Sequence, residues 1–257
     1  MYRLDNEFTN GRFAVTVVGC GGTGGFVAEG ICRFLPPEAI LMLIDHDRVE
    51  ERNILRQCFT MEDLGKFKAE ALACRLSRVH RRPVAYITLP VAMVEITVPG
   101  LVIGCVDNGL ARRDIAEAVK GSLYPPFGYR SWWVDAGNGE NYGQVLVGNT
   151  DKVGLCTPVG DIYHGLPFPT VQRPDLLLQT PQARDCTSIA EEQGPTINLT
   201  MAAAVVEVVR RLLAGTCPWV QLYIDMETGT HAPVFVTPET IKALTERKGG
   251  RHGKRKR

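Results

Sequence analysis

Glycines and charged residues that could bind a nucleotide lie close together early in the chain. Gly19, Gly21 and Gly24 fit the pattern G-x-G-x-x-G within VVGCGGTGG, and Asp45 follows about twenty residues later. In such a turn the first glycine permits a sharp bend, the second lets phosphate approach backbone N–H groups, and the acidic residue accepts hydrogen bonds from ribose hydroxyls. The spacing predicts a nucleotide site, and by this motif alone the ligand would be NAD.

Polar residues just after the predicted second strand favour a triphosphate over NAD. Asn53, Arg56 and Gln57 occur in DHDRVEERNILRQCF, and Lys68 follows in DLGKFK. A triphosphate carries about twice the charge of the two phosphates in a dinucleotide and needs Arg, Lys and a metal ion to balance it. The alternative is an ordinary solvated loop, and for Arg56 and Lys68 the residues alone leave both interpretations open.

Asp107, in GCVDNGLARR, follows another predicted strand and would stand at the same edge of the sheet as the glycine turn. A carboxylate at that point can hold Mg²⁺ against the phosphates, and the metal neutralises charge as pyrophosphate leaves. The alternative is an Asp that caps the helix after Asn108.

A sheet with helices on both faces is needed to bring these strand ends together. Residues 13–45 read as strand, helix and strand, which is a β-α-β unit. Further helices are predicted in GKFKAEALACRLSRVH and GLARRDIAEAVKG, and further strands in VAYITL, GLVIGCVD, WWVDAG and GQVLVGN. The alternation predicts an α/β fold with a doubly wound, mostly parallel, Rossmann-like sheet.

The second half of the chain begins with an irregular stretch. Residues 150–194 contain several prolines and no clear periodicity, so we expect a long crossing loop without regular elements there. A long apolar helix with Pro195 as its first residue follows, then a hairpin in WVQLYIDMETGTHAPVFV and a short helix in PETIKALTERK. These form the predicted C-terminal helix and hairpin part.

Composition sets limits on partners and compartment. The chain has 257 residues, 45% of them hydrophobic, and a formal charge of +1, which favours one domain, over residues 1–246, and indicates no general affinity for nucleic acid. No apolar stretch approaches the roughly 18 residues of a membrane span, so we expect a cytoplasmic protein without membrane contact. The basic tail, residues 247–257, should be disordered, and is either solvated or a contact for nucleic acid.

Taken together, GCGGTGG, DHD, NILRQ, GKFKAE and CVDN resemble the ATP-binding core of the ThiF/MoeB/ubiquitin-activating enzyme superfamily. The resemblance covers residues 13–148 and resumes at residues 185–215. Within that superfamily the chain is most similar to the ThiF-family proteins encoded with plasmid PRTRC systems.

The resemblance implies an adenylyltransferase that uses ATP and Mg²⁺. In such enzymes the C-terminal carboxylate of a small ubiquitin-like or sulfur-carrier protein attacks the α-phosphate of ATP. By analogy Asp45 would hold the ribose, Asp107 would position Mg²⁺, and the phosphates would be held by Asn53, Arg56 and Lys68. The full set of expected nucleotide-binding residues is Gly19, Gly21, Gly22, Gly24, Asp45, Asp47, Asn53, Arg56, Gln57, Lys68, Asp107 and Asn108.

The expected catalytic residues are Arg56, Lys68, Asp107 and Cys186. Cys186 lies in ARDCTSIA, where the resembled family often has a cysteine that takes the acyl group as a thioester or handles sulfur. A neighbouring Arg184 and the start of a helix favour the thiolate, which is the nucleophile, whereas Asp185 disfavours it. The alternative is an ordinary loop thiol.

The chain departs from the resembled family in two ways. Its eight cysteines form no C-x-x-C pair, so we expect free thiols and no zinc. Arg3 and Arg12 stand in no motif that matches the arginine with which many family members reach a partner's ATP site. The expected partners, by resemblance, are a small ubiquitin-like protein that ends in glycine and a second copy of the chain.

Other functions fit parts of the pattern. An enzyme of this fold could activate a small carboxylate or a tRNA nucleoside, which the basic tail would suit. A non-catalytic ATP-binding module of a plasmid-encoded complex would bind ATP without releasing pyrophosphate. An NAD-dependent oxidoreductase would explain the glycine turn, but it would give no function to Arg56, Lys68 and Asp107.

Overall fold

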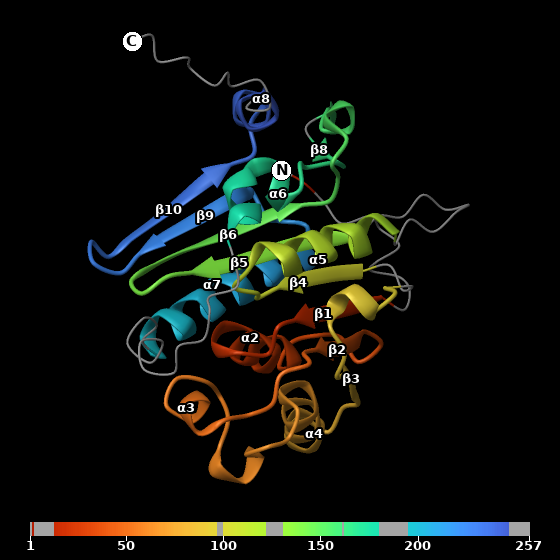
Figure 1. The fold of residues 1–257 in the computed structure, drawn as a ribbon. Coiled ribbons are helices and arrows are strands. Elements are labelled where there is room, and N and C mark those ends of the chain that lie inside the picture. The colour runs from red at the N-terminus through yellow and green to blue at the C-terminus, as the bar shows by residue number, and fades with distance from the viewer. Residues whose placement is uncertain are drawn as a thin grey trace.

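An eight-stranded sheet runs through the molecule in the order β10-β9-β6-β5-β4-β1-β2-β3 (Figure 1). The computed structural model describes Tyr2 and residues 13–96, 100–121, 131–160, 162–179 and 195–246. Five neighbouring strands are parallel, namely β1 (Ala14–Val18), β2 (Ile40–Ile44), β3 (Val84–Ile87), β4 (Gly100–Gly104) and β5 (Trp132–Asn138). Their apolar, β-branched sequences are typical of strands covered on both faces.

Three antiparallel strands extend this parallel half. They are β6 (Tyr142–Gly148), β9 (Trp219–Asp225) and β10 (Thr230–Phe235). The turn between β5 and β6 makes a hairpin, and β9 and β10 form the predicted second hairpin. The expected doubly wound, mostly parallel α/β fold is therefore confirmed, with an antiparallel addition at one side.

Helices cover both faces of the sheet. The first face carries α2 (Gly22–Cys32), α4 (Lys68–His80) and α7 (Pro195–Leu213), and the second carries α5 (Gly109–Gly121) and α6 (Pro169–Gln172). Side chains alternate along each strand, so Val15 and Val17 pack under the first face while Val18 packs under the second. Two further helices are α3 (Glu51–Ile54) and α8 (Pro238–Glu246).

The stretch predicted as a loop without regular elements is folded where the structure describes it. It contains the 3-10 helices η3 (Val153–Leu155) and η4 (Pro174–Leu178), the short strands β7 (Pro158–Val159) and β8 (Ile162–Tyr163), and α6. The prediction was wrong because two of the prolines begin helices, where a missing N–H costs nothing. Phe168 packs in the core of the second face, and Leu176 is buried in η4, which contacts α5.

Two predicted features lie outside the described residues. They are the stretch around Cys186 and the basic tail, so both stay predictions. Within the described ranges no helix is long and apolar enough to cross a membrane.

Candidate functional site

The glycine turn joins the end of β1 to the start of α2, and two of its glycines are required by the protein itself. Gly19 has φ +87°, and a Cβ there would stand 2.5 Å from the carbonyl oxygen of Cys105. A Cβ at Gly24 would overlap the carbonyl oxygen of Gly19. Gly19 therefore makes the bend, and Gly24 lets the helix approach the strand end.

Gly21 differs, because the protein leaves space beside it. Within the described part of the chain, a Cβ at this position would meet nothing nearer than Nε2 of Gln57, at 3.7 Å. Gly21 is the N-cap of α2, no side chain among the described residues caps that end, and no acidic residue lies in the first turn. The first N–H groups of α2 are thus open to a ligand, which is how helix ends bind phosphate.

Gln57 borders the same space. Its Oε1 is buried and accepts no hydrogen bond from the part of the chain that the structure describes. A buried acceptor without a donor costs free energy that a hydroxyl or amine from a ligand would recover. The bare backbone at Gly21 and this oxygen both fit a bound nucleotide.

Asp45 follows β2 and binds the glycine turn directly. Its Oδ2 accepts the Cys20 N–H at 2.6 Å, and its Oδ1 accepts the Asp47 N–H at 2.8 Å. Burial raises the pKa of Asp45, whereas the Lys68 charge and the two backbone N–H groups oppose that rise. Both oxygens keep a lone pair for ribose hydroxyls, so the geometry fits the predicted role.

Lys68 begins α4 and is paired with Asp47. Its Nζ lies 3.1 Å from Oδ2 of Asp47, and its side chain is 9% exposed. The Lys68 backbone N–H also donates to the Asp47 carbonyl oxygen at 2.8 Å. Two residues predicted as separate nucleotide contacts, Asp47 and Lys68, therefore form one partly buried ion pair next to Asp45.

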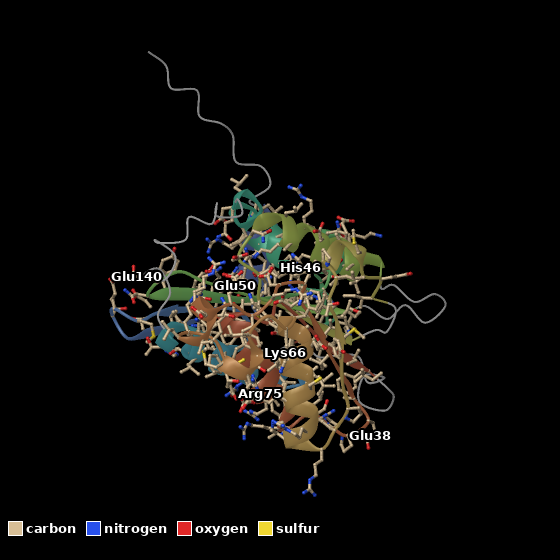
Figure 2. All side chains as sticks on the ribbon, turned by 60° about the horizontal axis from the view of Figure 1, so that its bottom comes forward. Glu38, His46, Glu50, Lys66, Arg75 and Glu140 are labelled. Atoms are coloured by element: carbon tan, nitrogen blue, oxygen red, sulfur yellow. The ribbon has the colours of Figure 1, made fainter. Side chains whose placement is uncertain are left out.

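The segment after β2 carries the other predicted phosphate ligands. Asn53 is buried in α3, where its Oδ1 accepts the Glu50 N–H at 2.9 Å, and the Gln57 N–H donates to the Asn53 carbonyl oxygen at 2.8 Å. Figure 2 labels His46, Glu50 and Lys66 from this part of the chain near the middle of the view. Asn53 thus shapes the segment, and a direct phosphate contact stays a prediction.

Arg56 and Asp107 come from different elements and interact through their charges. Burial lowers the pKa of Arg56, the nearby Arg52 lowers it further, and Asp107 raises it. The guanidinium is therefore close enough to the predicted metal ligand to sense its charge. A cation from the segment after β2 and a carboxylate from the end of β4 are thus near enough for their charges to interact.

Asn108, and not Asp107, caps α5. Its Oδ1 accepts the Ala111 N–H at 2.9 Å, and its Nδ2 donates to Oδ1 of Asp107 at 3.1 Å. The alternative in which Asp107 caps the helix is wrong. The Asp107 carboxylate is exposed at the sheet edge, and a hard oxygen ligand in that position fits Mg²⁺ shared with phosphates.

A buried polar cluster behind the glycine turn was not predicted. The Thr23 hydroxyl lies 3.1 Å from Oδ1 of Asn138, and the Asn138 Nδ2 lies 3.3 Å from Oδ1 of Asn198. The Asn198 Nδ2 donates to the Arg56 carbonyl oxygen at 3.3 Å, and a Cβ at Gly22 would overlap the Asn198 amide. Gly22 therefore has a packing reason to be glycine, besides its predicted contact with the nucleotide.

The signal for this cluster in the sequence is one polar residue on the buried side of an apolar helix. Asn198 is 1% exposed within α7, and buried amides normally have partners. The partners could not be named from the sequence because they lie 60 and 175 residues away.

Among the described residues, one group could hold a metal by its own side chains. Ligand atoms of Asp45, His46 and Asp47 lie within 4.8 Å of one another. This group borders the glycine turn and does not include Asp107. Cys186 lies outside the described residues, so its role stays a prediction, and Arg3 and Arg12 lie outside them as well.

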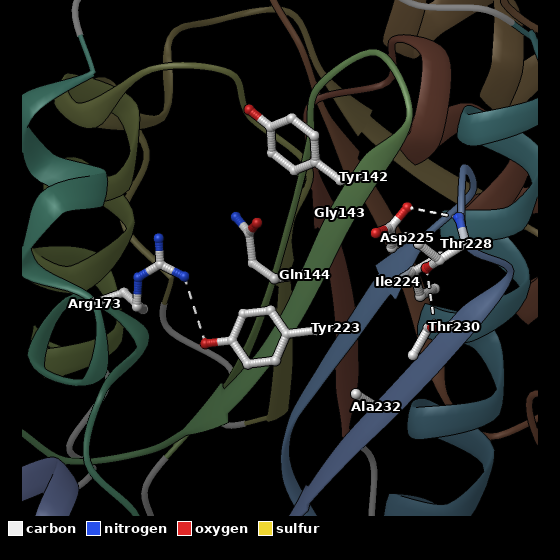
Figure 3. A pocket seen from close by; sticks show the side chains of 10 residues that line it. All are labelled: Tyr142, Gly143, Gln144, Arg173, Tyr223, Ile224, Asp225, Thr228, Thr230 and Ala232. Atoms are coloured by element: carbon white, nitrogen blue, oxygen red, sulfur yellow. Dashed lines mark hydrogen bonds between the residues drawn. The ribbon is translucent and has the colours of Figure 1, made fainter.

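A separate pocket of about 410 Å³ lies over β6, β9 and β10 (Figure 3). Tyr142, Gln144 and Tyr223 point into it, and Arg173 donates to the Tyr223 hydroxyl at 3.4 Å while it binds Asp175. None of the predicted nucleotide-binding residues lines this pocket. It is a second hollow, distinct from the glycine turn.

Comparisons with known proteins agree with this architecture. The model of the ThiF family matches residues 10–221. Among solved structures, PaaA is 16% identical with a TM-score of 0.61, over 88% of this chain and 65% of that one. MccB of E. coli is 18% identical with a TM-score of 0.58, over 88% and 63%. No curated protein matches the chain.

These likenesses concern the fold. The chain spans 65% of the PaaA chain and 63% of the MccB chain, so each of those proteins has a substantial part without a counterpart in the match. MccB of E. coli has been solved with ATP, and also with AMPCPP and MccA.

Proposed function

This chain belongs to the ThiF family, and on that premise we propose that it is an ATP-dependent adenylyltransferase acting on a carboxylate of a small protein. A carboxylate oxygen of the donor attacks the α-phosphorus of ATP. The bond from that phosphorus to the bridging oxygen breaks, pyrophosphate leaves with the electron pair, and an acyl-adenylate remains. Such chemistry depends on positioning and charge stabilisation.

One observation carries the proposal. The N-terminus of α2 is open at Gly21, and Asp45, hydrogen-bonded to the same turn, stands beside it. The turn provides N–H donors for phosphate, and the carboxylate provides acceptors for ribose. Arg56 and Lys68 supply positive charge near this position, which a dinucleotide would need less than a triphosphate.

The solved structures of similar fold support a nucleotide triphosphate as ligand. MccB of E. coli has been solved with ATP and with AMPCPP together with MccA. In this chain we assign Asp45 to the ribose, Asn53, Arg56 and Lys68 to the phosphates, and Asp107 to Mg²⁺. When bound, Mg²⁺ neutralises charge on the phosphates and on the departing pyrophosphate.

The finer parts of the proposal concern the donor and the second step. The donor is a small ubiquitin-like protein with a C-terminal glycine. The Cys186 thiolate then attacks the acyl carbon, a thioester forms, and AMP leaves with the electron pair of the broken bond. We also propose that the chain forms a homodimer and is related to the ThiF-family proteins of PRTRC systems. Both points rest on the resemblance in sequence.

ATP–pyrophosphate exchange by the purified chain is the test. With Mg²⁺ and a neighbouring small protein that ends in glycine, labelled pyrophosphate should enter ATP. Without that protein it should not, because pyrophosphate release requires the attacking carboxylate. Exchange that depends on the donor would establish both adenylation and the donor.

Two variants separate the two steps. Asp107→Ala should abolish exchange, whereas Cys186→Ala should retain exchange and lose only the thioester, detected as a band sensitive to thiols. Loss of exchange in Cys186→Ala would contradict this division. The matched control is Cys74→Ala, a change at an exposed cysteine on α4, which should retain both steps.

The remaining outcomes identify the alternatives. Binding of MgATP without exchange for any small protein would favour a non-catalytic module, unless a small carboxylate or a tRNA nucleoside restores turnover. Tighter binding of NADH than of MgATP would instead favour an oxidoreductase.

A further inference from the structure

A buried ion pair lies behind the Asp107 turn, at a place where a cation is disfavoured. Arg112 is in the first turn of α5 and Asp135 is on β5, and their side chains are 1% and 0% exposed. Positive charge near a helix N-terminus opposes the helix dipole, and burial of both charges adds a desolvation cost. Apolar side chains in place of this ion pair would stabilise the core equally well, so stability alone does not explain the pair.

The guanidinium of Arg112 joins three separate elements. Its Nε donates to Oδ2 of Asp135 at 3.0 Å, its Nη1 to Oε1 of Gln179 at 2.6 Å, and its Nη2 to the carbonyl oxygen of Val106 at 2.7 Å. Val106 immediately precedes Asp107, and Gln179 follows η4. One rigid fork therefore connects the sheet core, the Asp107 turn and the end of η4.

A second set of contacts braces the same turn. The Gly109 N–H donates to the Gln179 carbonyl oxygen at 2.8 Å, and a Cβ at Gly109 would overlap the Leu177 carbonyl oxygen. The Arg112 N–H donates to the Asn108 carbonyl oxygen at 3.3 Å, and the Asn108 amide reaches Asp107. The start of α5 is thus held from the core side and from the η4 side.

We propose that Arg112 is a positioning residue for the Mg²⁺ site, because it fixes Asp107 through Val106 and ties Gln179 to the same buried carboxylate. The inference rests on the proposed function, in which Asp107 holds the metal. Mg²⁺ demands near-ideal octahedral geometry, so a ligand whose backbone can shift binds it poorly. Groups that orient a metal ligand commonly change metal affinity about 10–100-fold when mutated.

Lysine cannot replace this arginine. An ammonium keeps the charge opposite Asp135 but cannot present a planar fork to three acceptors at once. Arg112→Lys should therefore leave the buried carboxylate compensated while Val106 and Gln179 lose their partner. Gln179→Ala removes one arm of the fork and leaves the ion pair intact.

The test is the Mg²⁺ concentration needed for half-maximal ATP binding, measured by calorimetry on the full chain. Arg112→Lys should raise it about tenfold, Gln179→Ala should raise it by a smaller factor, and ATP binding without Mg²⁺ should stay unchanged in both. If Arg112 only stabilised the fold, Arg112→Lys would weaken ATP binding both with and without Mg²⁺.

Arg82→Lys is the matched control. The Arg82 guanidinium also binds several carbonyl oxygens, those of Leu35, Pro36 and Ala39, just before β2 at the opposite edge of the sheet. This variant loses a comparable fork, so its melting temperature should fall while its Mg²⁺ requirement stays that of the wild type. If Arg112→Lys fails to fold, Gln179→Ala decides the question.

A folded Arg112→Lys protein with the wild-type Mg²⁺ requirement would overturn the inference, and so would an equal rise in Arg82→Lys. The two proposals fail separately. A wild-type chain that binds MgATP without any pyrophosphate exchange refutes adenylation, yet the Mg²⁺ titration of binding still decides the role of Arg112.

Discussion

The glycines of one turn have different physical tasks. Gly19 has a positive φ, Gly24 makes room for its own strand end, and Gly22 makes room for the Asn198 amide. Gly21 alone has ordinary contact distances around a hypothetical Cβ. Gly21 is therefore the glycine of this turn that internal packing does not require, and we place the phosphate there.

Gly21→Ala and Gly24→Ala should consequently have opposite profiles. Among the described residues there is space for a methyl group at Gly21, so Gly21→Ala should lose less stability than Gly24→Ala and bind ATP about tenfold more weakly. Gly24→Ala should lose about 3 kcal/mol or more, because its Cβ overlaps backbone. Urea unfolding and ATP titration measure the two effects, and wild-type ATP affinity in Gly21→Ala would count against the phosphate assignment.

Side-chain contacts near the ends of two helices, α5 and α7, stabilise those helices. α5 begins beside Asp107 because the Asn108 side chain accepts the Ala111 N–H. The sequence allows either residue to be the cap, and the register of the helix selects Asn108. On α7, Glu207 binds Arg210 and Arg211 one turn further along.

Replacement of Asn108, the cap of α5, should lower the free energy of unfolding by a measurable amount. Asn108→Ala leaves the Ala111 N–H without its acceptor and should lower the free energy of unfolding by about 1 kcal/mol. Asn108→Ser retains a capping oxygen and should recover most of that loss. Urea unfolding checks both, and an alanine variant as stable as the serine variant would show that the cap contributes little.

The Glu207 contacts predict a dependence of stability on pH. Hydrogen bonds from Arg210 and Arg211 lower the pKa of Glu207 to about 2 from 4.5. A carboxyl with a lowered folded pKa stabilises the fold above its unfolded pKa, and that stability is lost as the pH falls from 4.5 towards 2.

The measurement is the free energy of unfolding of wild type and Glu207→Gln across this range. The side chain is 37% exposed, so solvent screening limits the difference at pH 7 to about 0.5–1 kcal/mol. The difference in free energy of unfolding between wild type and Glu207→Gln should decrease below pH 4.5. Glu246→Gln, in an exposed pair with Lys242, is the control and should show almost none, whereas a Glu207→Gln difference independent of pH would contradict the argument.

At the scale of the whole molecule, Tyr2 ties an early residue to strands far along the chain. Its ring stacks on Trp132 with centroids 5.2 Å apart, and its hydroxyl donates to the Trp219 carbonyl oxygen at 2.5 Å. Tyr2 is fully buried. Trp132 begins β5, so this anchor lies at the amino edge of the parallel strands, opposite the proposed nucleotide site.

Two substitutions separate the ring of Tyr2 from its hydroxyl. Tyr2→Phe should cost about 1 kcal/mol, because the Trp219 carbonyl loses a donor, and Tyr2→Ala should cost about 3–5 kcal/mol, because a cavity forms against Trp132. Urea unfolding followed by tryptophan fluorescence measures both. Since the anchor is far from the glycine turn, folded Tyr2→Phe should bind ATP like the wild type; a Tyr2→Ala protein of wild-type stability would refute the anchor.

Features that depend on local pattern could be predicted from the order of the residues. The alternation of apolar strands and helices predicted the doubly wound sheet, which the structure confirms. The spacing from Gly19 to Asp45 predicted a ribose ligand at Asp45; its carboxylate accepts the Cys20 N–H of the glycine turn, and the contact with ribose stays a prediction. Such patterns act over one β-α-β unit, so periodicity and handedness are sufficient to define them.

The pairing of distant polar groups, in contrast, could be read only from the folded chain. Arg112 meets Gln179 across 67 residues, and Thr23 meets Asn138 across 115. Pro169 and Pro174, predicted as loop residues, are helix starts in the folded chain, next to the buried Phe168 and Leu176. Local pattern shows that a buried polar group needs a partner, but the partner is chosen by packing of the whole chain.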